Sequence, residues 1–307
     1  MKYVVTGGAG FIGSHIVKFL VEQKHTVIVI DNLQVGTKKR LESIKEKIDF
    51  YQVDILNFDE VEQIVQGSDG IFHQAALTSL PESFEKPEEY HNVNVNGTEN
   101  IFKLSKKYGF KVVYASSSSV YGEVKKIPIS ENFEKNPLNP YAETKLQDEL
   151  LALKYSKLGS KIIGLRYFNV FGKGQTGSYA GVITKFINKV IQKESPEIFG
   201  KGNQIRDFVS VEDVVQANYL AMTSNVNVGF FNIGTGKTYS ILEIAEIIIN
   251  AASLSQKPIF RDALPGDALL SKANIKLAKS SLNWEPKLDL KIWLKNEIPK
   301  IIEKNKN

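Results

Sequence analysis

The chain has 307 residues, 42% of them hydrophobic and 24% charged, which allows a sizeable buried core and excludes a disordered protein. Its net charge of +5 comes from lysines scattered among glutamates, so no nucleic-acid partner is expected. With no cysteine and no ligand spacing among the four histidines, no metal site is expected either. Because no apolar run approaches a membrane helix and no signal peptide opens the sequence, we expect a cytoplasmic protein without a membrane partner.

Short β-branched runs alternate with amphipathic segments through the first half of the chain. Strands are predicted at 2–6, 25–31, 48–54, 70–76, 111–117 and 160–169, and helices at about 14–23, through the forties and between the later strands. Strand and helix in alternation indicate parallel βαβ units. We therefore predict an α/β fold, a doubly wound parallel sheet of the Rossmann type, whose carboxyl strand ends share one ligand-binding edge.

The first strand runs into the glycine-rich turn TGGAGFIG, with Gly7, Gly10 and Gly13 spaced three apart. Such glycines allow a tight turn and a close approach of the backbone to a pyrophosphate at the helix N-terminus. The second strand ends in Asp31, where a carboxylate holds both ribose hydroxyls and repels a 2′-phosphate, so NAD is favoured over NADP. Asp54, after the third strand, has two open roles: a contact to the adenine amine or a helix N-cap.

The segment PYAETK places Tyr141 and Lys145 one turn apart on the same face of a helix whose first turn holds Pro140. A free tyrosine, with a pKa of about 10, is a poor base near neutrality. A neighbouring ammonium stabilises a phenolate, and a shift of about three units corresponds to about 4 kcal/mol. The pair is therefore a candidate base and its activator, close to the serines of YASSSSVYG.

Together, TGGAGFIG, the strand-end serines, YAETK, RYFNVFG and RDFVSVEDV resemble the extended short-chain dehydrogenase/reductase family, from residue 1 to about Trp284. Within it, the chain is most similar to nucleotide-sugar epimerases of the UDP-glucose/UDP-N-acetylglucosamine 4-epimerase kind. The resemblance implies NAD-dependent 4-epimerisation of a UDP-hexose or UDP-N-acetylhexosamine through a transient 4-keto sugar. It also implies a homodimer built on helices near 92–108 and 141–157.

The same resemblance implies the site residues and the domains. The catalytic residues are Tyr141, Lys145 and Ser117. The cofactor is held by Gly7, Gly10, Phe11, Ile12, Gly13, Asp31, Asn32, Asp54, Ile55, Ala75, Asn94, Lys145 and Phe168. The substrate is held by Ser117, Tyr141, Asn169, Val182, Phe199, Arg206, Asp267 and Ser271. The expected domains are an NAD-binding part, 1–168 joined by about 207–231, and a smaller α/β part for the nucleotide sugar, 169–206 with 232–307.

Several positions depart from patterns that are common in the family. Ser118 and Ser119 stand where the similar dehydratases carry acids, so elimination of water is disfavoured. Leu264 stands where many relatives have a phosphate-binding arginine, for which Arg261 could substitute. Gln74, Glu82 and the segment FGKGQ replace a leucine and two arginines. Ser271 stands where hexose-restricted epimerases have a bulky tyrosine, which leaves room for an N-acetyl group.

Three other readings remain open. The first is a UDP-glucuronate 4-epimerase, since some of these also lack the arginine at position 264. The second is a dehydratase or reductase; a reductase using NADPH would need a basic residue near Asp31, and Asn32 and Leu33 supply none. The third is a non-catalytic NAD-binding regulator, which the presence of Ser117, Tyr141 and Lys145 disfavours.

Overall fold

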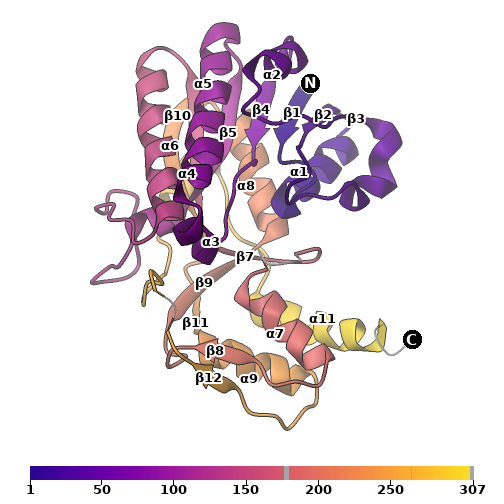
Figure 1. Ribbon diagram of the computed structural model, residues 1–307, viewed down its shortest axis with the longest axis vertical. Helices are drawn as coiled ribbons and strands as arrows, with labels where there is room; N and C mark the ends of the chain where they lie inside the picture. Colours follow the sequence, from indigo (N-terminus) through magenta and orange to yellow (C-terminus); the bar gives the residue numbers. More distant parts are fainter. Residues whose placement is uncertain (176–179, 264, 305–307) are drawn as a thin grey trace.

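Seven β-branched runs form the central sheet of the protein, whose computed structural model describes residues 1–175, 180–263 and 265–304 (Figure 1). The strands are β1 (Lys2–Thr6), β2 (Thr26–Ile30), β3 (Ile48–Tyr51), β4 (Gly70–His73), β5 (Lys111–Ser117), β6 (Lys161–Tyr167) and β10 (Val228–Ile233). Their order is β10-β6-β5-β4-β1-β2-β3, and every neighbouring pair is parallel. The predicted doubly wound parallel sheet is confirmed.

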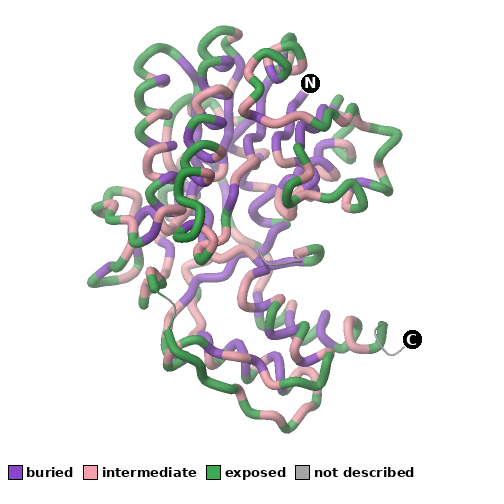
Figure 2. The backbone as a smooth tube through the Cα atoms, in the orientation of Figure 1, coloured by how far each residue is buried: buried purple, intermediate pink, exposed green. Residues whose placement is uncertain are grey.

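Helices cover both faces of this sheet. One face carries α1 (Phe11–Glu22), α8 (Val211–Thr223) and α10 (Lys276–Leu282), and the other carries α2 (Phe58–Val65), α5 (Gly97–Tyr108) and α6 (Pro140–Lys157). Along β1, Tyr3 and Val5 pack toward α1 and α8, whereas Val4 packs toward α2 and α5. Because both faces are covered, the inner strands are apolar without alternation, and Figure 2 shows them buried along most of their length. The edge strand β3 instead alternates between half-buried and exposed residues.

The smaller part of the chain lies below the sheet in Figure 1. It contains β7 (Asn169–Phe171), α7 (Val182–Ile191), β8 (Glu197–Phe199), β9 (Ile205–Ser210), β11 (Thr238–Ser240), α9 (Ile241–Ala251), β12 (Ile259–Arg261) and α11 (Leu290–Lys304). The strands form two small sheets, β11-β9-β7 and β12-β8. Helices α7, α9 and α11 share a separate apolar core. In the sequence, α8 and β10 lie between β9 and β11 but belong to the large sheet and its covering helices, so the chain crosses between the two parts several times.

Some predicted boundaries are wrong for identifiable reasons. The first helix starts at Phe11, not at Ser14, because the backbone turns helical directly after the extended Gly10. The charged segment of the forties is a 3-10 helix, η1 (Lys38–Lys47), in which Leu41 alone is buried, so no apolar stripe favours an α-helix. The strands predicted to reach 54 and 76 end at Tyr51 and His73, and the polar residues that follow them are loops.

A wide helical turn precedes α5. The short helices α3 (Leu80–Glu85) and α4 (Pro87–Tyr90) lead into a π-helical turn, η2 (His91–Asn96), which continues directly into α5. The helix predicted near 92–108 is therefore present, but its first part has five-residue rather than four-residue hydrogen bonding. Asn94 lies in this turn and is fully buried.

A buried polar network joins α6 to the sheet. The Arg166 guanidinium donates to both carboxylate oxygens of Glu149, each at 2.7 Å, and both side chains are at most 4% exposed. Ser116 at the end of β5 donates to the same carboxylate at 2.7 Å. Arg166 also donates to the Tyr121 hydroxyl, which donates in turn to Asn232 of β10. Every charged atom of the ion pair is thus bonded, as a buried pair requires.

We predict that Glu149→Ala lowers the free energy of unfolding by about 3–5 kcal/mol, because it leaves the Arg166 charge buried without its partner. Urea unfolding followed by circular dichroism measures this loss. Glu194→Ala is the control, since its ion pair with Lys189 is exposed and is worth less than about 1 kcal/mol. Equal small losses for both variants would contradict the role assigned to the buried pair.

Candidate active site

A cavity of about 410 Å³ opens at the carboxyl ends of the central strands. This is the edge at which a doubly wound sheet binds its ligands. Most of the residues predicted from the sequence line it: Gly7, Gly10, Phe11, Ile12, Gly13, Asp31, Asn32, Asp54, Ile55, Ala75, Ser117, Tyr141, Lys145, Phe168, Asn169 and Val182. One cavity therefore brings together residues from both the cofactor and the substrate sets.

The glycine-rich turn forms one wall of the cavity and tolerates no side chain at two places. A Cβ on Gly7, whose φ is +65°, would lie 2.6 Å from the backbone nitrogen of Ala75. A Cβ on Gly13 would lie 2.1 Å from the carbonyl oxygen of Gly7. Among the described residues no side chain caps α1, and its first turn lines the cavity. Such a turn fits the pyrophosphate of a dinucleotide, held by backbone N–H groups at the helix N-terminus.

Asp31 directly follows β2, lines the cavity and is 7% exposed. Its Oδ2 accepts a hydrogen bond from the Ala9 N–H at 2.9 Å, and its Oδ1 accepts one from the Leu33 N–H at 2.8 Å. Burial raises the pKa of Asp31, and both bonds and the positive charge of Arg40 act in the opposite direction. The carboxylate is therefore held rigidly by the backbone while it lines the cavity.

Arg40 is a cavity residue that the sequence reasoning missed. It donates to the carbonyl oxygens of Ala9 and Gly174, each at 3.3 Å, and lines the cavity near Asp31. Asn32 and Leu33 supply no basic residue, as the sequence shows, but Arg40 brings a positive charge close to Asp31. The lysine-rich segment around Arg40 has the pattern of a solvated surface, so nothing in its local sequence predicts this position.

The two open roles of Asp54 can now be separated. The N-cap of α2 is Asn57, which accepts from the Glu60 N–H, so Asp54 does not cap that helix. Instead, Asp54 accepts from the Asn32 side chain at 2.8 Å and from the Leu56 N–H at 2.9 Å, and it lines the cavity. The contact to adenine remains a proposal, and the capping role is wrong.

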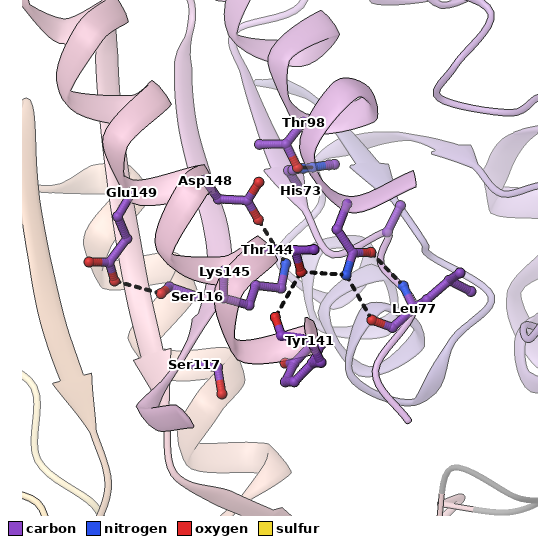
Figure 3. A network of polar contacts seen from close by, with 12 residues as sticks. His73, Leu77, Thr98, Ser116, Ser117, Tyr141, Thr144, Lys145, Asp148 and Glu149 are labelled. Carbon is purple, nitrogen blue, oxygen red and sulfur yellow. Dashed lines mark hydrogen bonds and ion pairs between the residues drawn. The ribbon is translucent and has the colours of Figure 1, made fainter. Parts of the chain in front are cut away.

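The catalytic candidates come from two neighbouring elements (Figure 3). Tyr141 and Lys145 stand one turn apart on α6, whose first turn is capped by Asn139 through the Ala142 N–H at 2.8 Å. Ser117 ends β5, and its Oγ accepts from the Ser119 N–H at 3.1 Å. It thereby caps the 3-10 helix η3 (Ser118–Tyr121).

Two further serines explain the run of four. Ser119 also places its hydroxyl 2.8 Å from that of Ser117. Ser116 points away from the cavity's reacting side to Glu149 and is structural, as expected. The serine run therefore ends a strand, caps a turn and orients a hydroxyl.

Lys145 is only 3% exposed, and its Nζ lies 3.1 Å from the Oδ2 of Asp148, which is fully buried. The sequence reasoning missed this acid, because an aspartate three residues after a lysine is an ordinary helix pattern. Asn94, predicted to contact the cofactor, lies behind the cavity wall. It bonds the N–H and C=O of Leu77 at 2.8 and 3.0 Å and the Thr144 hydroxyl at 3.0 Å. Its role is thus to brace the loop after β4.

Four predicted substrate residues lie outside the cavity lining. Arg206 forms an ion pair with Asp267 at 2.5 Å and also donates to the carbonyl of Leu269. Phe199 is 39% exposed on β8. Ser271 is half-buried, and its N–H donates to the carbonyl of Ile205 at 3.0 Å. The structure places Arg206, Asp267 and Ser271 at β9 and Phe199 on β8, all outside the cavity lining.

The departures from the family pattern also have definite places. Arg261, considered as a substitute at the phosphate, pairs with Glu197 at 3.0 Å on the exposed strand β12, while Leu264 lies outside the described residues. Gln74 lines the cavity and bonds Asn218, and Tyr167 donates to it. Glu82 accepts from Lys86 at 3.0 Å and from the Tyr90 hydroxyl.

The structure can be searched directly for membrane-spanning helices and for groups of metal-binding side chains. No helix in the parts of the chain that the structure describes is long and apolar enough to cross a membrane. Nor do the described histidine, aspartate and glutamate side chains form a group that could hold a metal ion.

Comparison with known proteins agrees with this geometry. Residues 3–234 match the sequence model of the NAD dependent epimerase/dehydratase family. The chain belongs to this family. A putative UDP-glucose 4-epimerase of Methanocaldococcus jannaschii is 41% identical over 300 residues, which cover 96% of each chain. The enzyme class and the NAD cofactor predicted from the sequence are therefore confirmed.

Two solved structures are similar over almost the whole chain. The UDP-glucose 4-epimerase of Thermotoga maritima, solved with UDP-glucose, has a TM-score of 0.94 at 34% identity and covers 99% of both chains. The UDP-N-acetylglucosamine 4-epimerase of Methanobrevibacter ruminantium, solved with UDP-N-acetylmuramic acid, has a TM-score of 0.92 at 36% identity. The matched region covers 99% of the present chain and 98% of the chain in that structure. The similarity thus extends to the smaller part of the chain, beyond the segment that matches the family model.

Proposed function

We propose that the protein interconverts UDP-sugars that differ at C4, with Tyr141, Lys145 and Ser117 as its catalytic residues. The observation that carries this proposal is the shared cavity, which collects these three side chains and the glycine-rich turn at one edge of the sheet. The similarity to UDP-sugar 4-epimerases supports the substrate class. NAD, when bound, supplies the acceptor and donor of the hydride that the reaction exchanges.

Each of the three residues has one task in this chemistry. Tyr141 removes the proton of the sugar hydroxyl as a 4-keto sugar forms, and it returns a proton when the hydroxyl is restored. The ammonium of Lys145, one helical turn away, stabilises the phenolate. The Ser117 hydroxyl binds the same sugar oxygen, and its bonds to Ser119 fix its orientation. Asp31, the glycine turn and the first turn of α1 would hold the cofactor.

The serines at 118 and 119 support epimerisation over elimination. Removing a proton bound to carbon requires a base, and a neutral hydroxyl is not one at neutral pH. Ser119 is committed to Ser117, as its hydroxyl lies 2.8 Å from the Ser117 hydroxyl. A dehydratase of this family would need an acid at one of these positions, so the proposed enzyme leaves C5 of the sugar untouched.

Ser271 supports an N-acetylated sugar as an accepted substrate. Its side chain is small and half-buried, and it follows the segment that pairs Asp267 with Arg206. We propose that Arg206 and Asp267 belong to the nucleotide side of the site, and that UDP-GlcNAc and UDP-GalNAc are accepted. UDP-glucuronate is the second candidate. Some UDP-glucuronate 4-epimerases also lack the phosphate-binding arginine at the position of Leu264, and here Arg261 does not replace it because it pairs with Glu197.

We also propose that the two parts of the chain act as domains, with the nucleotide sugar bound by 169–206 and 232–307, in a cytoplasmic homodimer. The dimer would use α6, where Leu150 and Leu153 are 59% and 42% exposed, and Leu158 directly after the helix is 50% exposed. On α5, by contrast, Ile101 and Leu104 are fully buried in the protein's own core and can make no such contact.

Sedimentation equilibrium should give a molecular mass twice that of one chain. The Leu150→Lys variant should reduce the measured mass to that of one chain.

The central experiment follows the anomeric proton signals by NMR after UDP-GlcNAc, UDP-glucose or UDP-glucuronate is added separately, without added NAD. We expect the signal of the 4-epimer with at least one sugar, since a retained cofactor is regenerated in every turnover. Tyr141→Phe should reduce the rate by about 10²–10⁴-fold, the usual contribution of a general base. No epimer with any of the sugars, from protein that carries NAD, would contradict the proposal.

Ser271→Tyr tests the sugar preference. The phenol ring should fill the space beside C2 and lower kcat/KM for UDP-GlcNAc at least tenfold, while UDP-glucose is spared. Ser271→Ala is the matched control and should leave both values near those of the wild type. If Ser271→Tyr lowers both sugars equally, the position does not select the sugar.

A further inference from the structure

Asp148 is a buried acid that the proposed chemistry does not use. It lies on α6, three residues after Lys145, and its side chain is fully shielded from solvent. Its Oδ2 accepts from the Lys145 Nζ at 3.1 Å, as Figure 3 shows. The lysine side chain is itself only 3% exposed. The activating ammonium therefore has a carboxylate as a direct neighbour before any ligand is considered.

The groups around this carboxylate come from three further elements. Thr98 of α5 and His73 of β4 lie beside it, joined by a bond of 2.9 Å between the hydroxyl and Nε2. Burial, and then the charge of Lys145, lower the pKa of His73 to about 3, so its ring is neutral. The buried phenol of Tyr114 on β5 is also close enough to respond to the negative charge of Asp148.

The remaining charges nearby are already paired. Glu149 follows Asp148 on α6, but both of its oxygens accept from Arg166. The Oδ1 of Asp148 has no hydrogen-bond partner among the described residues. Burial raises the pKa of Asp148 to about 6, although Lys145 and the Thr98 hydroxyl act in the opposite direction. Among the described residues, Lys145 is the ion-pair partner of this carboxylate.

Apolar packing gives no reason for an acid at this position, but the buried charge of Lys145 does, because a buried ammonium without a partner is costly. A buried carboxylate with one unbonded oxygen costs more than a small apolar side chain in the same place. Without the acid, the positive charge of Lys145 would no longer be offset by a neighbouring carboxylate, and its electrostatic effect on the other groups around it would be stronger. The effect of Asp148 must therefore be sought in the ammonium that it contacts.

We propose that Asp148 is a positioning residue for Lys145. Asp148 holds the Lys145 ammonium in place and offsets part of its positive charge, so that Tyr141 loses its proton at a higher pH than it would without Asp148. This inference rests on the proposed role of Tyr141 as the base. The sign follows from electrostatics: a negative charge near a phenol opposes formation of the phenolate, and it weakens the opposite effect of the lysine. The acid thus adjusts the pH range in which the base works.

Asp148→Asn tests this inference, because the amide keeps an oxygen that accepts from Lys145 and removes only the charge. In the wild type, kcat/KM for the UDP-sugar should rise with pH as the base loses its proton. We expect this rising limb to move to lower pH by roughly 0.5–1 unit in Asp148→Asn, as for removal of a nearby like charge. Glu143→Gln is the matched control: it removes the same charge from an exposed position of the same helix and should leave the limb unchanged.

A second readout does not depend on turnover. The ultraviolet absorbance of tyrosinate is titrated in protein that carries its cofactor, and the curve of the same protein with Tyr141→Phe is subtracted. The difference reports Tyr141 alone, and its midpoint should fall by the same amount when Asp148→Asn is introduced into both. If Asp148→Asn fails to fold, Asp148→Ala is measured in the same way.

The outcomes separate the two proposals. Midpoints that coincide for the wild type and Asp148→Asn, or a shift of equal size in Glu143→Gln, would overturn the inference about Asp148. If the wild type converts no UDP-sugar, the proposed function fails, and the tyrosinate titration still decides whether Asp148 acts on Tyr141. If Asp148→Asn lowers the midpoint of the Tyr141 titration and also moves the rising limb of kcat/KM to lower pH, the result supports both the proposed function and the inference about Asp148.

Discussion

The ion pair between Glu149 and Arg166 is the interaction on which the active-site geometry depends. Through it, α6 is fixed against β6, and the bond from Ser116 fixes the same carboxylate to the end of β5. Arg166 also bonds Tyr121, so the 3-10 turn that begins after Ser117 is attached to the same guanidinium. The helix that carries Tyr141 and the strand that carries Ser117 therefore share one anchor. This explains how two elements joined by a long loop can present a common set of side chains.

The parts of the site that the sequence predicted are those set by local geometry. Three glycines spaced three apart determine a turn, and Tyr141 and Lys145 share a helix face because four residues make about one turn. Asp148 and Arg40 were missed for the opposite reason. Each stands in an ordinary charged helical pattern, and only the packing of distant segments shows that one is fully buried and the other lines the cavity. Nor could local pattern show that η1 is a 3-10 helix, because it contains a single buried side chain.

The substrate side shows a different limit of sequence reasoning. Arg206 and Asp267 were each assigned to the ligand, yet the structure pairs them with one another across 61 residues of chain. A guanidinium that has a carboxylate partner at 2.5 Å is already matched by an anion. A diphosphate that binds here must replace or share that partner. If Arg206 binds the nucleotide as proposed, the affinity would be a difference between two ion pairs and not the full strength of one.

The π-helical turn before α5 has a consequence for how the chain tolerates length changes. A π turn contains more residues than an α turn, and Asn94, which bonds Leu77 and Thr144, lies within it. Residues of an α-helix are spaced by about 100° around its axis. Deleting one residue between His91 and Val93 would restore regular winding yet swing Asn94 away from both partners. A change of chain length inside this turn would therefore cost the contacts by which Asn94 braces the loop after β4.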